Sequence, residues 1–290
     1  KRTRFIWDAA TKVEGKSLND FLVSGPNMYN NYLQIILQMR EGRYLIKGDL
    51  QEMFHQIVMR KEDRDSLRFL FRKSPNDKVQ ILRMRVMIFG SKSSPTTSQF
   101  VKNKIAEPYI QSHPEASNVI INKTYVDDVI TSIDNLQSGK SLISDVRQIL
   151  KSGGFNLVKL KSNCDDILED VRKNLSEDDL KNEKLFSKEN TEKLLGYNVN
   201  FQTDELSIAL TLERIPESIF NCNDKPTKKQ VLQLCMSIFD PIGFSEFLIS
   251  KFKLIYHWLI KDNYEWNQVM SDEYFVMWKK AIAWLKELTY

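Results

Sequence analysis

Two adjacent acidic residues, Asp127 and Asp128, interrupt an apolar stretch of the sequence. The residues on either side, 119–121 and 129–130, are β-branched, which predicts two strands joined by a tight hairpin turn that carries both acids. Like charges at such a turn repel each other, and a divalent cation between them relieves the repulsion. Carboxylate oxygens favour hard cations such as Mg²⁺ or Mn²⁺. Because Asp is also a common turn residue, a solvated hairpin tip is the plain alternative.

A third acid, Asp49, ends a predicted strand that begins at Arg43. The chain then leaves the sheet in a short turn or helix, so the carboxylate faces an open cleft. If the strands of Asp49 and of the Asp127–Asp128 pair are neighbours in one sheet, three carboxylates converge. Three carboxylates are the minimum set for two Mg²⁺ ions about 4 Å apart, one for an attacking hydroxyl and one for a leaving phosphate. This pattern predicts phosphoryl transfer, which needs positioned metal and positive charge rather than covalent catalysis.

Further short sequence motifs lie before and after these acids, and together they span most of the chain. They are residues 4–9 (RFIWDA), 18–20 and 25–27 (LND and GPN), 49–57 (DLQEMFHQI), 89–100 (FGSKSSPTTSQF), 125–128 (YVDD), 153–159 (GGFNLVK), 194–197 (LLGY) and 238–243 (IFDPIG). In this order they resemble the sequence blocks of reverse transcriptases from long-terminal-repeat retrotransposons, and they are most similar to the BEL/Pao group. The resemblance implies that the chain is a fragment of a Pol polyprotein.

The resemblance also implies a fold. We expect an α+β right-hand polymerase with fingers, a palm built on an antiparallel sheet, and a helical thumb. Its segments are then residues 1–24 (fingers, truncated at the N-terminal side), 25–56 (palm), 57–93 (fingers), 94–203 (palm) and 204–290 (a thumb- or connection-like helical region).

The implied function is RNA- or DNA-templated synthesis of DNA, in which a primer 3′-hydroxyl is extended with deoxynucleotides by two-metal phosphoryl transfer. The implied cofactor is a pair of Mg²⁺ ions, with Mn²⁺ as a possible replacement. The partners are a template with its primer and, in the parent polyprotein, an upstream aspartic protease and a downstream ribonuclease H and integrase. The implied location is intracellular, in a cytoplasmic particle or the nucleus.

Residue roles follow from the same resemblance. Asp49 and Asp127 are expected to bridge the metal ions, with Asp128 contributing less directly. Lys159 matches a lysine that protonates departing pyrophosphate; Lys161 is a rival, and a solvated strand edge is the alternative for both. The residues expected to bind the nucleotide are Arg4 at the α-phosphate, Phe54 as a steric gate against a ribose 2′-hydroxyl, Phe89, Gly90 and Gln99; those expected to contact the primer are Tyr125, Leu195, Gly196 and Tyr197.

Charge is unevenly distributed along the chain. Residues 1–110 hold 20 Lys and Arg against 11 Asp and Glu, whereas residues 111–220 hold 13 against 19. A basic first third is typical of a track for a polyanion, with a solvated surface as the alternative. No apolar run approaches the ~18 residues of a membrane span. The three cysteines form no Cys-x-x-Cys pair, which predicts reduced thiols.

Three other functions are alternatives to the polymerase. The first is a decayed or domesticated relic that binds nucleic acid or protein partners without catalysis. The second is a viral RNA-dependent RNA polymerase, which the large Phe54 side chain opposes. The third is a protease, which the absence of an Asp-Thr-Gly or Asp-Ser-Gly triplet opposes.

The periodicity of apolar residues predicts the remaining elements. Helices are expected at 28–40, 96–110, a segment through 142–150 that ends at Gly153-Gly154, 228–238, 244–260 and 273–288; strands are expected at 67–72 and 79–88 (as a hairpin), 155–160 and 194–201.

Overall fold

An antiparallel sheet of four strands forms the centre of the first part of the chain. Its strands are β1 (Tyr44–Leu50), β4 (Thr124–Tyr125), β5 (Asp128–Ile133) and β6 (Leu157–Ser162), in the spatial order β4-β5-β1-β6. The computed structural model describes residues 7–175, 184–187, 189–208, 212 and 215–288. Two compact units divide the chain, Lys1–Lys188 and Glu189–Tyr290. The expectation that the strands of Asp49 and Asp128 are neighbours is confirmed, because β1 pairs directly with β5.

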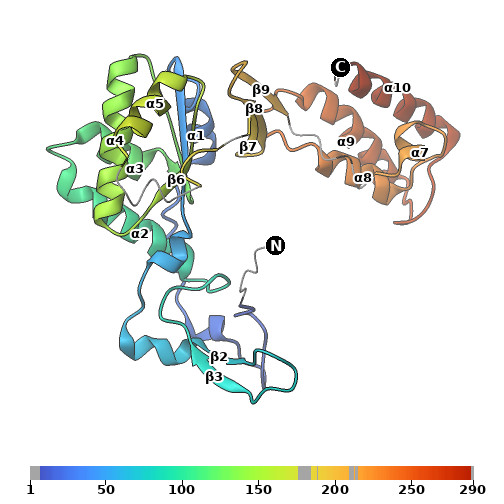
Figure 1. Ribbon diagram of the computed structural model, residues 1–290. Helices are drawn as coiled ribbons and strands as arrows, with labels where there is room; N and C mark the ends of the chain where they lie inside the picture. Colours follow the sequence, from blue (N-terminus) through green and yellow to red (C-terminus); the bar gives the residue numbers. More distant parts are fainter. Residues whose placement is uncertain (1–6, 176–183, 188, 209–211, 213–214, 289–290) are drawn as a thin grey trace. The chain divides into compact units, whose positions relative to one another are not determined.

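Helices cover one face of this sheet (Figure 1). Alternate residues of β1, Ile46 and Leu50, point into an apolar core that the helices complete, as the two-residue period of a strand requires. The helices are α2 (Ser94–Ala106), α3 (Pro114–Asn122), α4 (Leu136–Ser152) and α5 (Asp165–Lys173). The intervening positions of β1, including Asp49, belong to the other face of the sheet.

The rest of the first unit consists of one more helix, a separate hairpin and short 3₁₀ segments. Helix α1 (Tyr32–Gln38) contacts β4 and β5. A hairpin of β2 (Arg68–Phe71) and β3 (Gln80–Arg83) forms a separate two-stranded sheet. Four 3₁₀ segments complete this unit among the described residues: η1 (Leu18–Phe21), η2 (Met53–Gln56), η3 (Lys61–Leu67) and η4 (Glu107–Tyr109).

The second unit joins a small sheet to a helical layer. Strands β7 (Thr191–Leu194), β8 (Tyr197–Asn200) and β9 (Glu205–Ile208) form an antiparallel meander. Trp278 and Phe252 lie at the centre of its helical core with their rings 5.4 Å apart. The helices are α7 (Glu217–Phe220), α8 (Lys228–Ser237), α9 (Glu246–Lys261) and α10 (Asp272–Leu288), so the three long helices predicted here are confirmed. Nowhere in the described ranges is a helix both long and apolar enough to cross a membrane.

Some predicted elements are wrong, for identifiable reasons. Residues 119–121 belong to helix α3 and not to a strand, because Pro114 opens a helix whose buried positions recur at helical spacing. The predicted strand 194–201 is two strands, β7 and β8, since Leu195 and Gly196 both have positive φ and form the turn between them. Residues 84–88 lie outside β3. The five-segment division into fingers, palm and thumb stays a prediction.

One hydrogen-bond network ties the small sheet of the second unit to its helices. The Tyr197 hydroxyl donates to Asp240 Oδ1 at 2.9 Å and accepts from the Ile242 amide at 3.1 Å. The same carboxylate accepts from the amides of Gly243 and Ser245, and these bonds hold its pKa below the ordinary value against the opposing effect of partial burial. Asp240 therefore organises the corner before α9.

Removing the Tyr197 hydroxyl should loosen this corner. We expect Tyr197→Phe to lower the free energy of unfolding by about 1 kcal/mol, because it deletes two hydrogen bonds of a side chain that is 0% exposed. Urea denaturation measures the change. Tyr256→Phe, a half-buried tyrosine of the same unit, is the matched control and should change stability little. Equal effects of the two substitutions would contradict the network.

Candidate active site

The register between β1 and β5 brings the predicted acids together. Asp49 lies directly opposite Asp128 across the two strands, and side chains of directly opposed residues lie on the same face of an antiparallel pair. Next to this pair, the Leu50 amide donates to the carbonyl of Asp127 at 2.8 Å. The end of β1 and the turn before β5 therefore form one structural unit.

The turn is tight and conformationally unusual. Tyr125 pairs with Asp128, which leaves Val126 and Asp127 as its two central residues. Val126 has φ +56°, and a β-branched residue rarely adopts this left-handed conformation unless the surroundings hold it there. One such restraint is Gln99 of α2, whose Nε2 donates to the Val126 carbonyl at 2.8 Å. The predicted hairpin turn is confirmed; its first flanking strand is the two-residue β4, and residues 119–121 belong to the helix α3 before it.

A cavity of about 550 Å³ opens beside the turn. Two of the three acids, Asp49 and Asp127, line it together with two lysines, Lys159 and Lys184. Asp128 is not among its lining residues. The remaining walls come from residues 50–55, Phe89, Val126 and Val158.

Lys159 already neutralises one acid. Its Nζ lies 2.9 Å from Asp49 Oδ2, and it reaches this position from a β-bulge where the register of β6 against β1 shifts. Lys159 itself has φ +52°, a conformation that bulges accommodate. The bulge therefore aims this lysine into the cavity, as bulges beside functional sites often do.

The electrostatics differ between the two residues of the acid pair. Burial raises the pKa of Asp127, the negative charge of Asp49 raises it further, and Lys159 and Lys47 oppose both effects. Burial raises the pKa of Asp128 to about 6, against the opposing charge of Lys47. Lys47 is only 6% exposed and lies two residues before Asp49, so its charge acts on the acids from within the sheet.

The expected cluster of three acids is only partly formed. Within the described residues, no group of three or more His, Cys, Asp or Glu side chains is placed to hold a metal ion. Asp49 and Asp127 line the cavity together with a third acid, Glu52, and Mg²⁺ is commonly bound by one or two carboxylates together with substrate phosphates. The donor set thus fits an ion that arrives with a phosphate ligand rather than one held by a complete protein cage.

The predicted nucleotide residues separate into two groups. Phe54 and Phe89 line the acid cavity, with ring centroids 4.9 Å apart. Gly90 is required by packing: it has φ +94°, and a Cβ there would collide with the Trp7 carbonyl. Gln99 is 1% exposed and supports the turn. Arg4 lies outside the described residues.

The predicted primer residues also separate. Tyr125 packs with its ring 5.2 Å from Tyr32 and 6.2 Å from Tyr29. Leu195 and Gly196 form the turn of the β7–β8 hairpin in the second unit. The Tyr197 side chain, predicted to contact a primer, is fully buried, and its hydroxyl is hydrogen-bonded to Asp240 within the second unit.

Sequence reasoning missed four polar residues near the turn: Lys47, Lys184, Lys102 and Asn30. Lys47 shares the face of Asp49 by strand alternation, and Lys102 lies three residues after Gln99 on α2, so both had a local signal. Asn30 and Lys184 had none, because their positions depend on contacts between distant segments.

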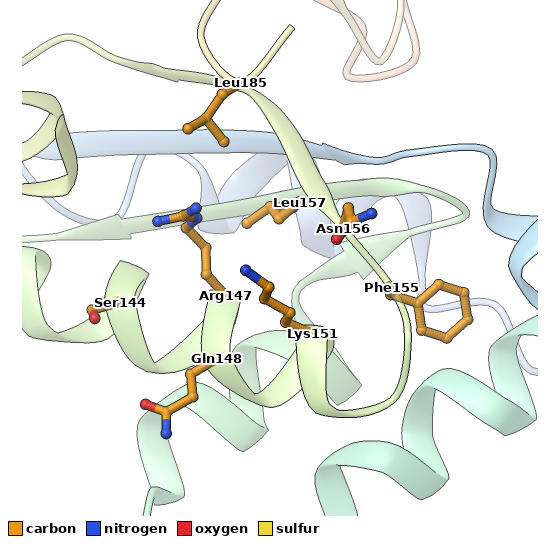
Figure 2. Close-up of a pocket in the computed structure, with 8 residues that line it drawn as sticks. All are labelled: Ser144, Arg147, Gln148, Lys151, Phe155, Asn156, Leu157 and Leu185. Atoms are coloured by element: carbon orange, nitrogen blue, oxygen red, sulfur yellow. The ribbon is translucent and has the colours of Figure 1, made fainter. Parts of the chain in front are cut away.

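A second, smaller cavity of about 180 Å³ lies behind the start of β6 (Figure 2). Arg147 and Lys151 of α4 point toward it, and Leu185 closes it from the other side. It shares no lining residue with the acid cavity, and no carboxylate belongs to its described lining. The predicted acids therefore belong to the larger cavity alone of these two.

The mutual repulsion of Asp49 and Asp127 can be measured directly. We expect Asp49→Asn to lower the pKa of Asp127, because it removes the negative neighbour that raises it, whereas Lys159→Met should raise that pKa by removing a positive neighbour. Carboxyl carbon chemical shifts, followed through a pH titration of the metal-free protein, measure both changes. An Asp127 pKa that both substitutions leave unmoved would show that the carboxylates do not face each other.

Comparisons with known proteins agree with this geometry. A family model described as reverse transcriptase (RNA-dependent DNA polymerase) matches residues 9–199. A second model, described as the Pao retrotransposon-like RNaseH-like domain, matches residues 227–290. A search of curated proteins found no match.

Solved structures resemble the chain in fold. The foamy viral protease-reverse transcriptase dRH in complex with double-stranded DNA has a TM-score of 0.59 and 16% identity, over 98% of this chain and 41% of the other. The foamy viral protease-reverse transcriptase in complex with an RNA/DNA hybrid has a TM-score of 0.54 and 16% identity, over 93% of this chain and 31% of the other. The chain thus spans less than half the length of either neighbour, and it has the right-hand polymerase fold. Together with the family match over residues 9–199, this makes the chain a member of the reverse transcriptase family, of the BEL/Pao retrotransposon type.

Proposed function

We propose that the chain carries the polymerase centre of an RNA- and DNA-templated DNA polymerase, which extends a primer 3′-hydroxyl with deoxynucleotides. The observation that carries this proposal is the shared cavity of Asp49, Asp127 and Lys159. The carboxylates of Asp49 and Asp127 come from the strand and the turn that the family match covers.

Asp49 and Asp127 are the residues that would hold two Mg²⁺ ions, with Mn²⁺ as a replacement. When bound, such ions activate the attacking hydroxyl and neutralise charge on the phosphates. Asp128 supports the site from outside the cavity, in keeping with its burial and its raised pKa.

Lys159 is the proposed proton donor to departing pyrophosphate. Its ammonium lines the cavity and lies beside Asp49. Lys161 is two residues further along β6 and does not line the cavity among the described residues, which favours Lys159 over this rival. Phe54, on the cavity wall, is the proposed gate against a ribose 2′-hydroxyl.

Nucleic acid is the proposed partner. Both foamy viral neighbours are complexes with a nucleic acid duplex, and the excess of Lys and Arg in residues 1–110 suits a phosphate backbone. Both neighbours are also joined to a protease, in line with an aspartic protease upstream in the parent polyprotein. A ribonuclease H and an integrase downstream complete the proposed arrangement.

One observation favours a second candidate, a relic that binds nucleic acid without catalysis. Asp49 is paired with Lys159, and no three-acid metal group forms among the described residues. In an inactive relic this ion pair would persist, whereas in an active polymerase Asp49 must exchange the lysine for a metal ion.

Primer extension on a homopolymer RNA template with Mg²⁺ or Mn²⁺ tests the polymerase. We expect activity in the unchanged chain and at least about a 100-fold loss in Asp127→Asn, because the substitution removes an anionic oxygen from the metal-facing pair. Asp166→Asn, on the exposed start of α5, is the matched control. Activity that survives Asp127→Asn would reject this site. Salt-dependent template binding without extension, unchanged when the chain is lengthened by its natural flanking residues, would favour the relic.

The gate makes a separate prediction about sugar selection. We expect Phe54→Ala to raise ribonucleotide incorporation relative to deoxynucleotide incorporation by about 10-fold or more, because the smaller side chain admits the 2′-hydroxyl. Competition between a nucleotide and its deoxy form in the extension assay measures the ratio. Phe71→Ala, at the fingers hairpin, is the control. Unchanged discrimination in Phe54→Ala would remove the gate from the proposal.

A further inference from the structure

The junction between α3 and β4, residues 120–124, is fixed by side chains from distant parts of the chain. A helix leaves the carbonyls of its last turn without partners inside the helix, and α3 ends at Lys123 without a glycine cap. Lys102 Nζ donates to the carbonyl of Ile120 and lies 3.5 Å from that of Ile121. The last turn of α3 is therefore capped from another helix.

Asn30 reinforces the same junction from the opposite direction in sequence. Its Nδ2 donates to the Ile121 carbonyl at 2.9 Å and to the Thr124 carbonyl at 2.8 Å. A single amide thus bridges the end of α3 and the start of β4. The residues that follow, Tyr125 to Asp128, are the turn that carries the acids.

The burial of Lys102 is costly. The side chain is 1% exposed, and burial lowers its pKa to about 7. Its recorded partners are backbone carbonyls, and the negative end of the α3 dipole is the compensating charge that they supply. An apolar side chain of the same length would avoid the desolvation of an amine. The advantage of a lysine here is therefore that its ammonium holds the end of α3 in place.

Lys102 is one of three polar contacts along one side of α2. Thr96 Oγ1 donates to the carbonyls of Ser24 and Pro26 at 2.7 and 2.9 Å. Gln99 holds the Val126 carbonyl, and Lys102 holds the end of α3. Residues spaced by three share a helix face. One face of α2 therefore holds three segments in place: the loop before Asn30, the turn and the α3–β4 junction.

The hairpin has a particular need of such external contacts. Strand β4 is two residues long and pairs only with β5 among the described strands. So short a strand contributes few ladder hydrogen bonds, and the turn carries a left-handed Val126. The position of Asp127 must then be set by the groups around the hairpin.

We propose that Lys102 and Asn30 are positioning residues that hold the α3–β4 junction and thereby keep the Asp127 carboxylate facing Asp49. Neither residue lines the acid cavity. This inference rests on the proposed polymerase function. It adds two residues, Lys102 and Asn30, which influence the turn by holding the α3–β4 junction.

The first test separates catalysis from binding. In primer extension we expect Lys102→Met to lower kcat about 10-fold and to leave the KM for the deoxynucleotide within about twofold, because a displaced carboxylate weakens the transition state more than the ground state. Asn30→Ala should act in the same direction. Lys104→Met is the matched control, since Lys104 is an exposed lysine on the same helix. A kcat unchanged in both Lys102→Met and Asn30→Ala would overturn the proposal.

The second test does not require activity. The Leu50 amide donates to the Asp127 carbonyl, and the Ile130 amide donates to the Lys123 carbonyl, so amide hydrogen exchange at these two residues reports on the hairpin position. We expect exchange at least about 10-fold faster in Lys102→Met and Asn30→Ala and unchanged in Lys104→Met. Exchange at Leu194, in the second unit, controls for global unfolding.

The two tests distinguish the two proposals. If the unchanged chain extends no primer but both amides lose protection in the variants, the polymerase proposal fails and the positioning contacts stand. If the unchanged chain is active and both amides keep their protection in Lys102→Met and Asn30→Ala, the positioning proposal fails and the polymerase stands.

Discussion

The repulsion between two carboxylates is the constraint on which the rest of the first unit depends. Asp49 and Asp127 share one cavity, and the negative charge of Asp49 adds to burial in raising the pKa of Asp127. A sheet that brings such groups together must supply positive charge. Lys159 supplies it in contact with Asp49, and Lys47 supplies it from within β1. Lys47 lies on the central strand β1 and Lys159 on its neighbour β6, so both charges are set by pairing with the strand that carries Asp49.

The two sides of the site are built in different ways. Asp49 belongs to β1, a central strand with hydrogen-bonded neighbours on both sides, and its position follows from regular sheet pairing. Asp127 belongs to a turn with a two-residue strand before it. Its position follows from irregular contacts: Gln99 on the turn, and Lys102 and Asn30 on the junction. The site thus has one acid positioned by strand pairing and one whose position depends on side chains of neighbouring elements.

The sequence was sufficient to predict the strand that carries Asp49, but it was insufficient to predict the contacts that position Asp127. Strand alternation and the motif order predicted β1, the hairpin turn and the pairing of β1 with β5. The short apolar run 119–121 was read as a strand, because a run of three β-branched residues does not separate a buried strand from a buried helix. The burial of Gln99 and Tyr197 and their hydrogen bonds within the protein were not predicted, because burial is a tertiary property; their roles toward nucleotide and primer stay predictions. The contacts of Asn30 join residues some ninety positions apart, and no local pattern encodes such a pair.

The second unit shows why a family description and a local structure must be compared residue by residue. The model that matches residues 227–290 is described as RNaseH-like, whereas the described residues of this segment form the helices α8, α9 and α10 around one apolar core. Asp240, between α8 and α9, accepts hydrogen bonds from Tyr197, Gly243 and Ser245. Asp262, at the end of α9, is bonded to the Tyr274 hydroxyl. Acids that are engaged in capping and in tyrosine bonds stabilise helix packing, and the acids that face a cavity are those of the first unit. Among the residues that the structure describes, the Asp240 network therefore joins the helical layer of the second unit to the hairpin of β7 and β8.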